Sequence, residues 1–191
     1  MGRNPLALLV TVGAILLQSP ASAATPEFQI TPRVGFGALK VDEFVGINRQ
    51  RVNSDTYGIG ASAGYLTPIG VVVEIGADSF RSFNPLEAFD DFRLSQEFAS
   101  IGYQFELGHR WRLVPRVGRA HWKLHSREGR LFHPGPEEER NVSGNGYFWE
   151  VGIARQISRV VTLGVSFKQG QYDFGRTQST AFTVTLGFGP Q

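Results

Sequence analysis

Apolar and polar positions alternate with a period of two along much of the chain. In segment 69–78, IGVVVEIGAD, every second residue is apolar, while Glu74 and Asp78 share the opposite face. Segment 57–65, YGIGASAGY, repeats the pattern, and only residues 66–68 separate the two. A period of two is typical of a β-strand with two different faces, and a short connection between two such segments is typical of a hairpin. We therefore predict two paired antiparallel strands.

Six further segments have a similar pattern, which brings the predicted number of strands to eight. They are residues 28–41, 92–106, 110–124, 144–156, 160–172 and 178–188. In two of them the apolar positions change parity, near Ala99 and near Gly118. An extra residue in one strand would shift the faces in this way, so we predict a β-bulge at each position.

The connections between these segments alternate in length. Short connections are expected near residues 67–68, 108–109 and 157–158. Long polar connections are expected at residues 42–53, 81–91, 125–143 and 173–177. Barrels of the bacterial outer membrane have short turns on the periplasmic side and long loops outside the cell. The predicted fold is therefore all-β, an eight-stranded antiparallel up-and-down transmembrane β-barrel.

One face of most strands is consistently apolar, for example Val71, Val73 and Ile75, and Phe182, Val184 and Leu186. The opposite face carries glycine, serine, threonine and charge. A closed barrel pairs all its backbone groups, so an apolar outer face is stable in lipid and the polar face must line the lumen. The charged residues that we place in the lumen are Arg33, Glu74, Asp78, Arg112, Arg116, Glu150 and Lys168.

The lumen of an eight-stranded barrel is about filled by side chains. We therefore expect these charges to form an internal ion-pair network that plugs the barrel. A gated ion path is the alternative.

Several aromatic residues fall near the predicted strand ends. Such residues form girdles at the two membrane interfaces, where an amphipathic ring is stable. We assign this role to Tyr57, Tyr65, Trp111, Trp122, Tyr147 and Phe188.

The composition agrees with a β-rich exported protein. The 191 residues include 23 glycines and 15 phenylalanines but no cysteine. Arg3, the apolar run 6–17 and the small residues of Ala21-Ser22-Ala23 match a signal peptide. We predict a signal peptide over residues 1–23 and a barrel domain over residues 24–191. The formal net charge is only +2 and no basic run contains interleaved aromatics, so we expect no binding to nucleic acid.

Four motifs, YGIGASAGY, VVVEIGAD, PRVGRAHWKLHS and FTVTLGFG, resemble strands of the OmpA-like transmembrane domain family. The resemblance covers nearly all of the predicted mature chain. It implies an eight-stranded outer-membrane barrel with an interior charge network and mobile surface loops. In this resemblance Glu74, Arg33 and Arg116 match lumenal charged positions of the family.

Two family positions differ in this chain. The arginine of the seventh strand corresponds to about Gly164, and the glutamate of the sixth strand to about Ala154. The family's gate is therefore not carried over intact, and we consider Glu150 and Lys168 as substitutes. The chain ends at Gln191, so we expect no peptidoglycan-binding domain.

A lipid A-modifying enzyme is a further alternative, because some barrels of similar shape carry a His, Ser and carboxylate site. His125 and Ser126 are adjacent, so on a strand their side chains would point to opposite faces. His121 and His125 would lie about 13 Å apart on a strand, too far to share one metal ion. We expect neither a cofactor nor a metal.

The expected role is structural or surface-interactive. The expected partners are outer-membrane lipid, lipopolysaccharide and surface ligands of the loops, and we expect a monomer.

Overall fold

The computed structural model describes residues 26–41, 52–82, 91–127 and 139–189, and its regular elements are all strands. The bounds are β1 Glu27–Val41, β2 Val52–Leu66, β3 Val71–Ser82, β4 Asp91–Tyr103, β5 Phe105–Gly108, β6 Trp111–Arg127, β7 Glu139–Gln156, β8 Val161–Tyr172 and β9 Gly175–Phe188. Within this described part, no helix is both long and apolar enough to cross a membrane. The predicted signal peptide, residues 1–23, lies outside the described residues and stays a prediction.

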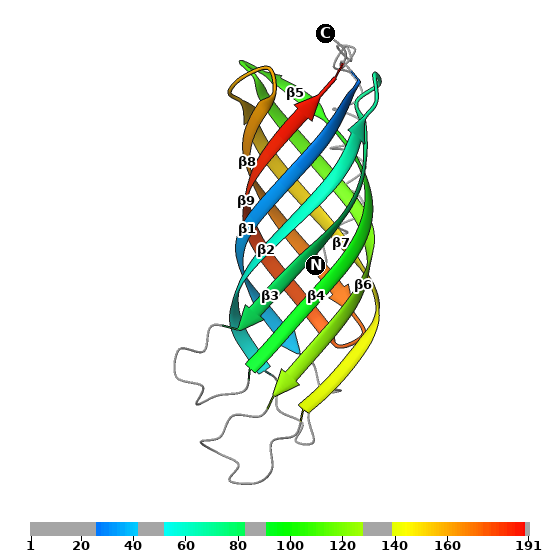
Figure 1. The fold of residues 1–191 in the computed structure, drawn as a ribbon, viewed down its shortest axis with the longest axis vertical. Coiled ribbons are helices and arrows are strands. Elements are labelled where there is room, and N and C mark those ends of the chain that lie inside the picture. Colours follow the sequence, from blue (N-terminus) through cyan, green and yellow to red (C-terminus); the bar gives the residue numbers. More distant parts are fainter. Residues whose placement is uncertain (1–25, 42–51, 83–90, 128–138, 190–191) are drawn as a thin grey trace, which may run out of the picture.

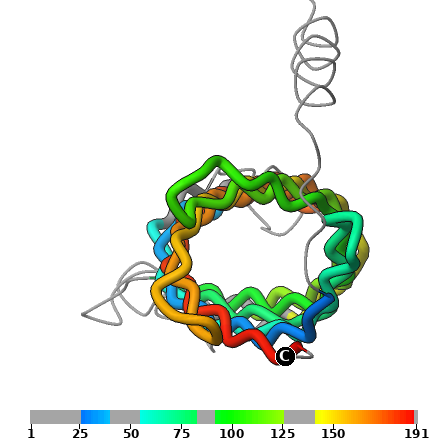
Figure 2. Tube along the Cα trace, turned by 90° about the horizontal axis from the view of Figure 1, so that it is seen from above, coloured from blue at the N-terminus to red at the C-terminus, as the bar shows by residue number. Residues whose placement is uncertain are grey.

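The strands close into an eight-stranded antiparallel barrel. β4 and β5 are separated by Gln104 and both pair with β6, so together they form one strand of the barrel. Each remaining strand pairs with its sequence neighbours, and β1 pairs with β9. Figure 1 shows the tilted strands, and Figure 2 shows the closed ring from one end. The predicted fold class is confirmed, and each of the eight predicted segments falls mainly on one strand of the barrel.

All four connections predicted to be long lie at one end of the barrel, and all four are shorter than predicted, two of them markedly. β8 ends at Tyr172 and β9 begins at Gly175, so the predicted loop 173–177 is a tight turn. β6 continues to Arg127 and β7 begins at Glu139, which leaves only residues 128–138 between them. The loop bounds were predicted from runs of polar residues. Polar side chains also fit the outer face of a strand where that strand has left the lipid.

The two predicted β-bulges were wrong. The pairing of β4 with β6 runs without a shift from Asp91↔Arg127 to Gly102↔Arg116, past Ala99 and Gly118. The register shift of this strand lies instead in β5, between Glu106 and Gly108. The apolar residues therefore move from the outer to the inner face of these strands, although the strands themselves are regular and contain no bulge there.

The change of face reflects an inversion of polarity along the barrel axis. Towards the end with the long connections, called here the loop end, the lumen is filled by a buried apolar cluster. Its members are Leu39, Phe92, Leu94, Phe98, Ala120, Trp122, Leu124, Phe148, Tyr172 and Phe174. The outward residues at the same levels are polar, for example Arg93 and Lys123. At the loop end the barrel thus has the inside-apolar arrangement of a soluble protein.

The middle and the opposite end of the barrel have an apolar outer wall. Large apolar side chains such as Val34, Ile59, Ile75 and Phe182 are well exposed there, as expected for a surface that faces lipid. Of the predicted interface aromatics, five are exposed on the outer face of the barrel, namely Tyr57, Tyr65, Trp111, Tyr147 and Phe188.

Trp122 is the exception and corrects the prediction. Its side chain is only 4% exposed and packs edge-on against Phe174, at 4.5 Å between ring centroids. Because β6 contains no bulge, Trp122 keeps the parity of Val114 and Arg116 and points into the lumen. It belongs to the apolar cluster and not to a membrane interface.

Candidate functional site: a charged network across the barrel lumen

Charged side chains meet in the middle of the lumen. Arg33 on β1, Glu74 and Asp78 on β3, Glu150 on β7 and Lys168 on β8 are all nearly fully buried, as inward positions on their strands require. Arg116 on β6 joins them. We call these six residues the waist network.

Arg33 lies at the centre of the waist network. Its guanidinium donates a hydrogen bond to Glu74 at 2.6 Å and lies 3.7 Å from Asp78 and 3.6 Å from Glu150. It also donates to the hydroxyl of Ser62 at 2.8 Å. Glu74 and Asp78 lie about 13 Å apart along β3, and the planar guanidinium bridges them. One cation therefore contacts three carboxylates.

Arg116 is the second arginine of the network and contacts the same two glutamates as Arg33. Its Nε lies 3.2 Å from Glu74, and its Nη1 donates to Glu150 at 3.4 Å. Glu150 is only 1% exposed and lies between Arg33 and Arg116. Each glutamate is therefore shared by the same two arginines.

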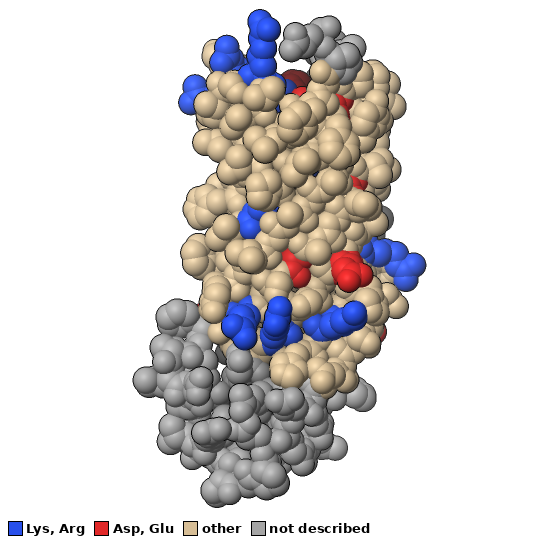
Figure 3. Space-filling model, in the orientation of Figure 1, with Lys and Arg blue, Asp and Glu red and all other residues tan. Residues whose placement is uncertain are grey.

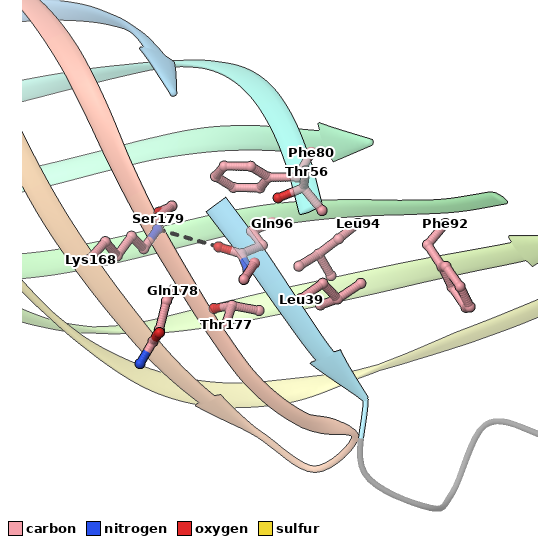
Figure 4. A pocket seen from close by; sticks show the side chains of 11 residues that line it. Leu39, Thr56, Phe80, Phe92, Leu94, Gln96, Lys168, Thr177, Gln178 and Ser179 are labelled. Atoms are coloured by element: carbon pink, nitrogen blue, oxygen red, sulfur yellow. Dashed lines mark hydrogen bonds between the residues drawn. The ribbon is translucent and has the colours of Figure 1, made fainter. Parts of the chain in front are cut away.

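Lys168 forms the loop-side layer of the network. Its ammonium donates to Asp78 at 2.8 Å and to the side-chain oxygen of Gln96 at 3.3 Å, the bond drawn in Figure 4. The same ammonium lies 4.4 Å from the ring centre of Phe98 and 4.3 Å from that of Phe148. An ammonium over two aromatic faces is attracted by both rings, more strongly in a desolvated site.

Glycines opposite the network give these side chains room. Gly60 pairs directly with Asp78, and a Cβ at Gly60 would collide with the Asp78 carboxylate. A Cβ at Gly118 would come within 2.5 Å of the Phe148 ring and of the Ala99 carbonyl oxygen. Glycine is therefore needed at these two positions, because the neighbouring large side chains leave no room for a Cβ.

Arg112 does not join the waist network, contrary to the prediction. It lies about 13 Å from Arg116 along β6, towards the short-turn end. There its Nε is 3.1 Å from Glu106, and its Nη2 donates to Gln156 at 3.3 Å. The prediction identified the face correctly, but the height along the strand separates Arg112 from the other charges.

The waist network is electrically balanced. Three cations, Arg33, Arg116 and Lys168, are matched by three carboxylates, Glu74, Asp78 and Glu150. Together with the hydrogen-bond partners Ser62 and Gln96, the network joins β1, β2, β3, β4, β6, β7 and β8. A cavity on the loop side of Lys168, lined among others by Leu39 and Leu94, has a volume of about 10 Å³, close to the lower limit for one water molecule.

The sequence matches the family model of the outer membrane protein β-barrel domain over residues 7–189. The chain belongs to this family. It is therefore an outer-membrane protein, as its apolar outer wall requires. No curated protein matches the sequence at a significant level.

Solved structures of the same fold include three bacterial outer-membrane barrels. Neisserial surface protein A has a TM-score of 0.66 at 14% identity, covering 84% of this chain and 97% of its own. Ail of Yersinia pestis has a TM-score of 0.60 at 14% identity, and the match covers 86% of this chain and 100% of Ail. The N-terminal barrel domain of OprF of Pseudomonas aeruginosa has a TM-score of 0.50 at 14% identity, and the match covers 83% of this chain and 97% of that domain. At this identity the likeness shows the fold alone.

In this outer-membrane barrel the histidines considered for chemistry lie on the outer wall. His121 and His125 each hydrogen-bond an asparagine of β7, Asn145 at 3.4 Å and Asn141 at 2.8 Å. In the part of the chain that the structure describes, no three His, Asp or Glu residues are grouped to hold a metal ion.

Sequence reasoning missed the aromatic part of this barrel's site. Phe98 and Phe148 flank Lys168, and their rings pack edge to face at 5.5 Å. A bulge was predicted near Ala99, and Phe98 was assigned to neither face. An unbroken parity count from Gln96 through Phe98 to Ser100 would have placed it inside.

Proposed function

We propose that this protein is a barrel with a sealed lumen that acts through its outer surface, not as a pore or an enzyme. The observation that carries the proposal is the waist network, whose six charges span the lumen and neutralise one another. The apolar cluster on its loop side supports the proposal, because an apolar segment opposes the passage of ions and polar solutes. We further expect the protein to act as a monomer.

A surface role also agrees with the known structures of this fold. Ail has been solved in complex with the heparin analogue sucrose octasulfate, so a barrel of this type can bind a polyanionic sugar. In the present chain the segments 42–51, 83–90 and 128–138, at the loop end, lie outside the described residues. We propose them as binding elements, together with the polar outer wall from which they leave.

The test is conductance of the refolded barrel in a planar lipid bilayer. Insertion is checked first by the change of mobility on a denaturing gel before and after boiling. We expect no steady channel activity from the inserted barrel. The double variant Phe98→Ala, Phe148→Ala provides the matched control, because it removes the two rings around Lys168 and leaves all six charges. We expect more conductance from this variant than from the unmodified barrel.

A steady single-channel current from the unmodified protein would contradict the sealed lumen and favour the pore. Mass spectrometry of lipid A from cells with and without the protein tests the enzyme alternative. A change in acyl chains or phosphates that depends on the protein would overturn a non-enzymatic role.

A further inference from the structure

The wall formed by β3, β4 and β6 continues past the apolar outer band at the loop end. On β6 the last large apolar outward residue is Val117, and the outward positions 119, 121, 123 and 125 are all polar. Lys123 lies about 20 Å beyond Val117 along the strand. On β3 the corresponding change occurs between Ile75 and Arg81. This part of the wall therefore faces the headgroup layer of the outer leaflet and not its acyl chains.

Basic side chains gather on this wall. Arg81 and Arg93 are direct cross-strand neighbours, and Lys123 lies diagonal to Arg93. Figure 3 shows a row of basic side chains across β3, β4 and β6 beside the loop end, with acidic atoms next to the row on the side away from the loop end. Among the described residues, none of these three cations forms an ion pair with a carboxylate. Like charges directly opposite on a sheet destabilise it, so an anion between them would stabilise this wall.

A hollow of about 440 Å³ lies beside these cations on the outer wall. One side is apolar and made of Ile59, Ala61 and Ala77, and it continues into the lipid-facing band. The other side carries Arg93 and Lys123. The small side chains of β2 and β3 next to the long ones of β4 and β6 create the hollow.

Other polar groups complete the surroundings of the hollow. Ser79 and Ser95 are direct cross-strand neighbours that line it and can donate hydroxyl hydrogen bonds. His121 lines it as well, together with two carboxylates. Glu97 lies exposed on its rim, and Asp78 is buried and already paired with Arg33 and Lys168 in the lumen. With Arg81 included, three cations face one exposed carboxylate. The site is therefore amphipathic and carries a net positive charge.

We propose that this hollow binds a phosphate group of lipopolysaccharide in the outer leaflet. Arg81, Arg93 and Lys123 contact the phosphate, and the apolar side at Ile59 and Ala77 contacts the lipid part of the same molecule. A ligand anchored in the leaflet reaches the site at a high effective concentration, because the hollow opens into the lipid-facing band. This favours a membrane glycolipid over a soluble polyanion. The inference uses the membrane position of the barrel and does not depend on the sealed lumen.

The test compares lipid binding by the folded, detergent-solubilised barrel in native mass spectrometry. The probe is a rough lipopolysaccharide with phosphates on lipid A and the inner core, alongside the same material after chemical removal of phosphate. The site variant is Arg81→Gln, Arg93→Gln, Lys123→Gln. The control variant, Arg110→Gln, Arg155→Gln, Arg159→Gln, removes the same charge from exposed positions at the short-turn end. Mobility before and after boiling shows that each variant is folded.

We expect the site variant to bind the phosphorylated probe at least about tenfold more weakly, because each basic residue near an anionic lipid surface contributes about a fivefold factor. The control variant should stay within about twofold of the unmodified barrel, and probe without phosphate should bind all three proteins equally weakly. If the triple variant fails to fold, Arg93→Gln and Lys123→Gln are measured singly, each with an expected loss of about fivefold.

Two results would overturn the proposal. One is equal binding of the probes with and without phosphate by the unmodified barrel. The other is an equal loss of binding in the site and control variants. A soluble sulfated oligosaccharide and inorganic phosphate are run in parallel. If the oligosaccharide binds through the same three residues as tightly as lipopolysaccharide does, the site is one for soluble polyanions and the lipid assignment is wrong.

Discussion

Lys168 on β8 donates a hydrogen bond of 2.8 Å to Asp78 on β3, across the full width of the lumen. The two strands are four steps apart in either direction around the barrel, so this bond joins opposite walls. The direct cross-strand neighbour of Lys168 is Glu150, yet Glu150 pairs with Arg33 and Arg116. The ion pair of Lys168 thus forms with a side chain that it meets across the interior, and not with its direct neighbour on the adjacent strand.

A double-mutant cycle on Asp78→Asn and Lys168→Gln measures the interaction energy between Asp78 and Lys168. We expect a coupling energy of about 0.5–3 kcal/mol in the free energy of unfolding, because the two groups are in direct contact. A second cycle, Asp78→Asn with Arg112→Gln, serves as the control and should give coupling below about 0.5 kcal/mol, because Arg112 pairs elsewhere. Equal coupling in both cycles would contradict the observed pairing. Unfolding in denaturant from lipid vesicles provides the energies.

Glu74→Gln should strongly destabilise the barrel. Glu74 contacts both Arg33 and Arg116, and removal of one partner from a buried ion pair costs about 3–5 kcal/mol. Glu106→Gln removes the same charge from the half-exposed pair with Arg112 and should cost less than about 1 kcal/mol. Denaturant unfolding of both variants measures the difference. A small effect of Glu74→Gln, similar to that of Glu106→Gln, would show that the waist network does not stabilise the fold.

Fluorescence quenching by brominated lipid tests the position of Trp122. The chain has three tryptophans, so each can be studied in a variant with phenylalanine at the other two positions. Trp111 and Trp149 are exposed on the outer wall and should be quenched by bromine in the acyl chains. Trp122 points into the lumen and should be quenched much less. Equal quenching of all three would place Trp122 in the lipid and contradict its observed packing against Phe174.

Gly118→Ala should destabilise the barrel through overpacking. The added methyl group would lie within 2.6 Å of the Phe148 ring and of the backbone of Ala99, and overpacking of this kind costs about 1–3 kcal/mol. Gly152→Ala is the matched control, since its Cβ would meet only ordinary contacts of 3.7 Å or more. Thermal or denaturant unfolding of the two variants provides the comparison. Equal stability of Gly118→Ala and Gly152→Ala would mean that the Phe148 ring is free to move.

The alternation of apolar and polar residues was sufficient to predict the barrel. A strand that faces lipid must carry apolar side chains at every second position, and this signal is local, so segments such as 69–78 and 178–188 display it without any tertiary information. The same alternation placed Glu74 and Asp78 on the inner face. The family match and the closed eight-stranded sheet confirm the predicted fold and membrane location.

What the sequence did not determine is where along the axis each residue lies and which distant residue it meets. The parity change near Ala99 and Gly118 has two local explanations, a bulge or an exchange of polarity between the two sides of the wall, and only the unbroken register of β4 with β6 decides between them. Trp122 and Phe98 lie in the lumen for this reason. The pairing of Lys168 with Asp78, and the separation of Arg112 from Arg116, depend on the tilt and closure of the whole sheet. Local periodicity thus determines the two faces of a strand within the lipid-facing band. The faces beyond that band, and the contacts across the lumen, are decided only by the pairing and closure of all eight strands.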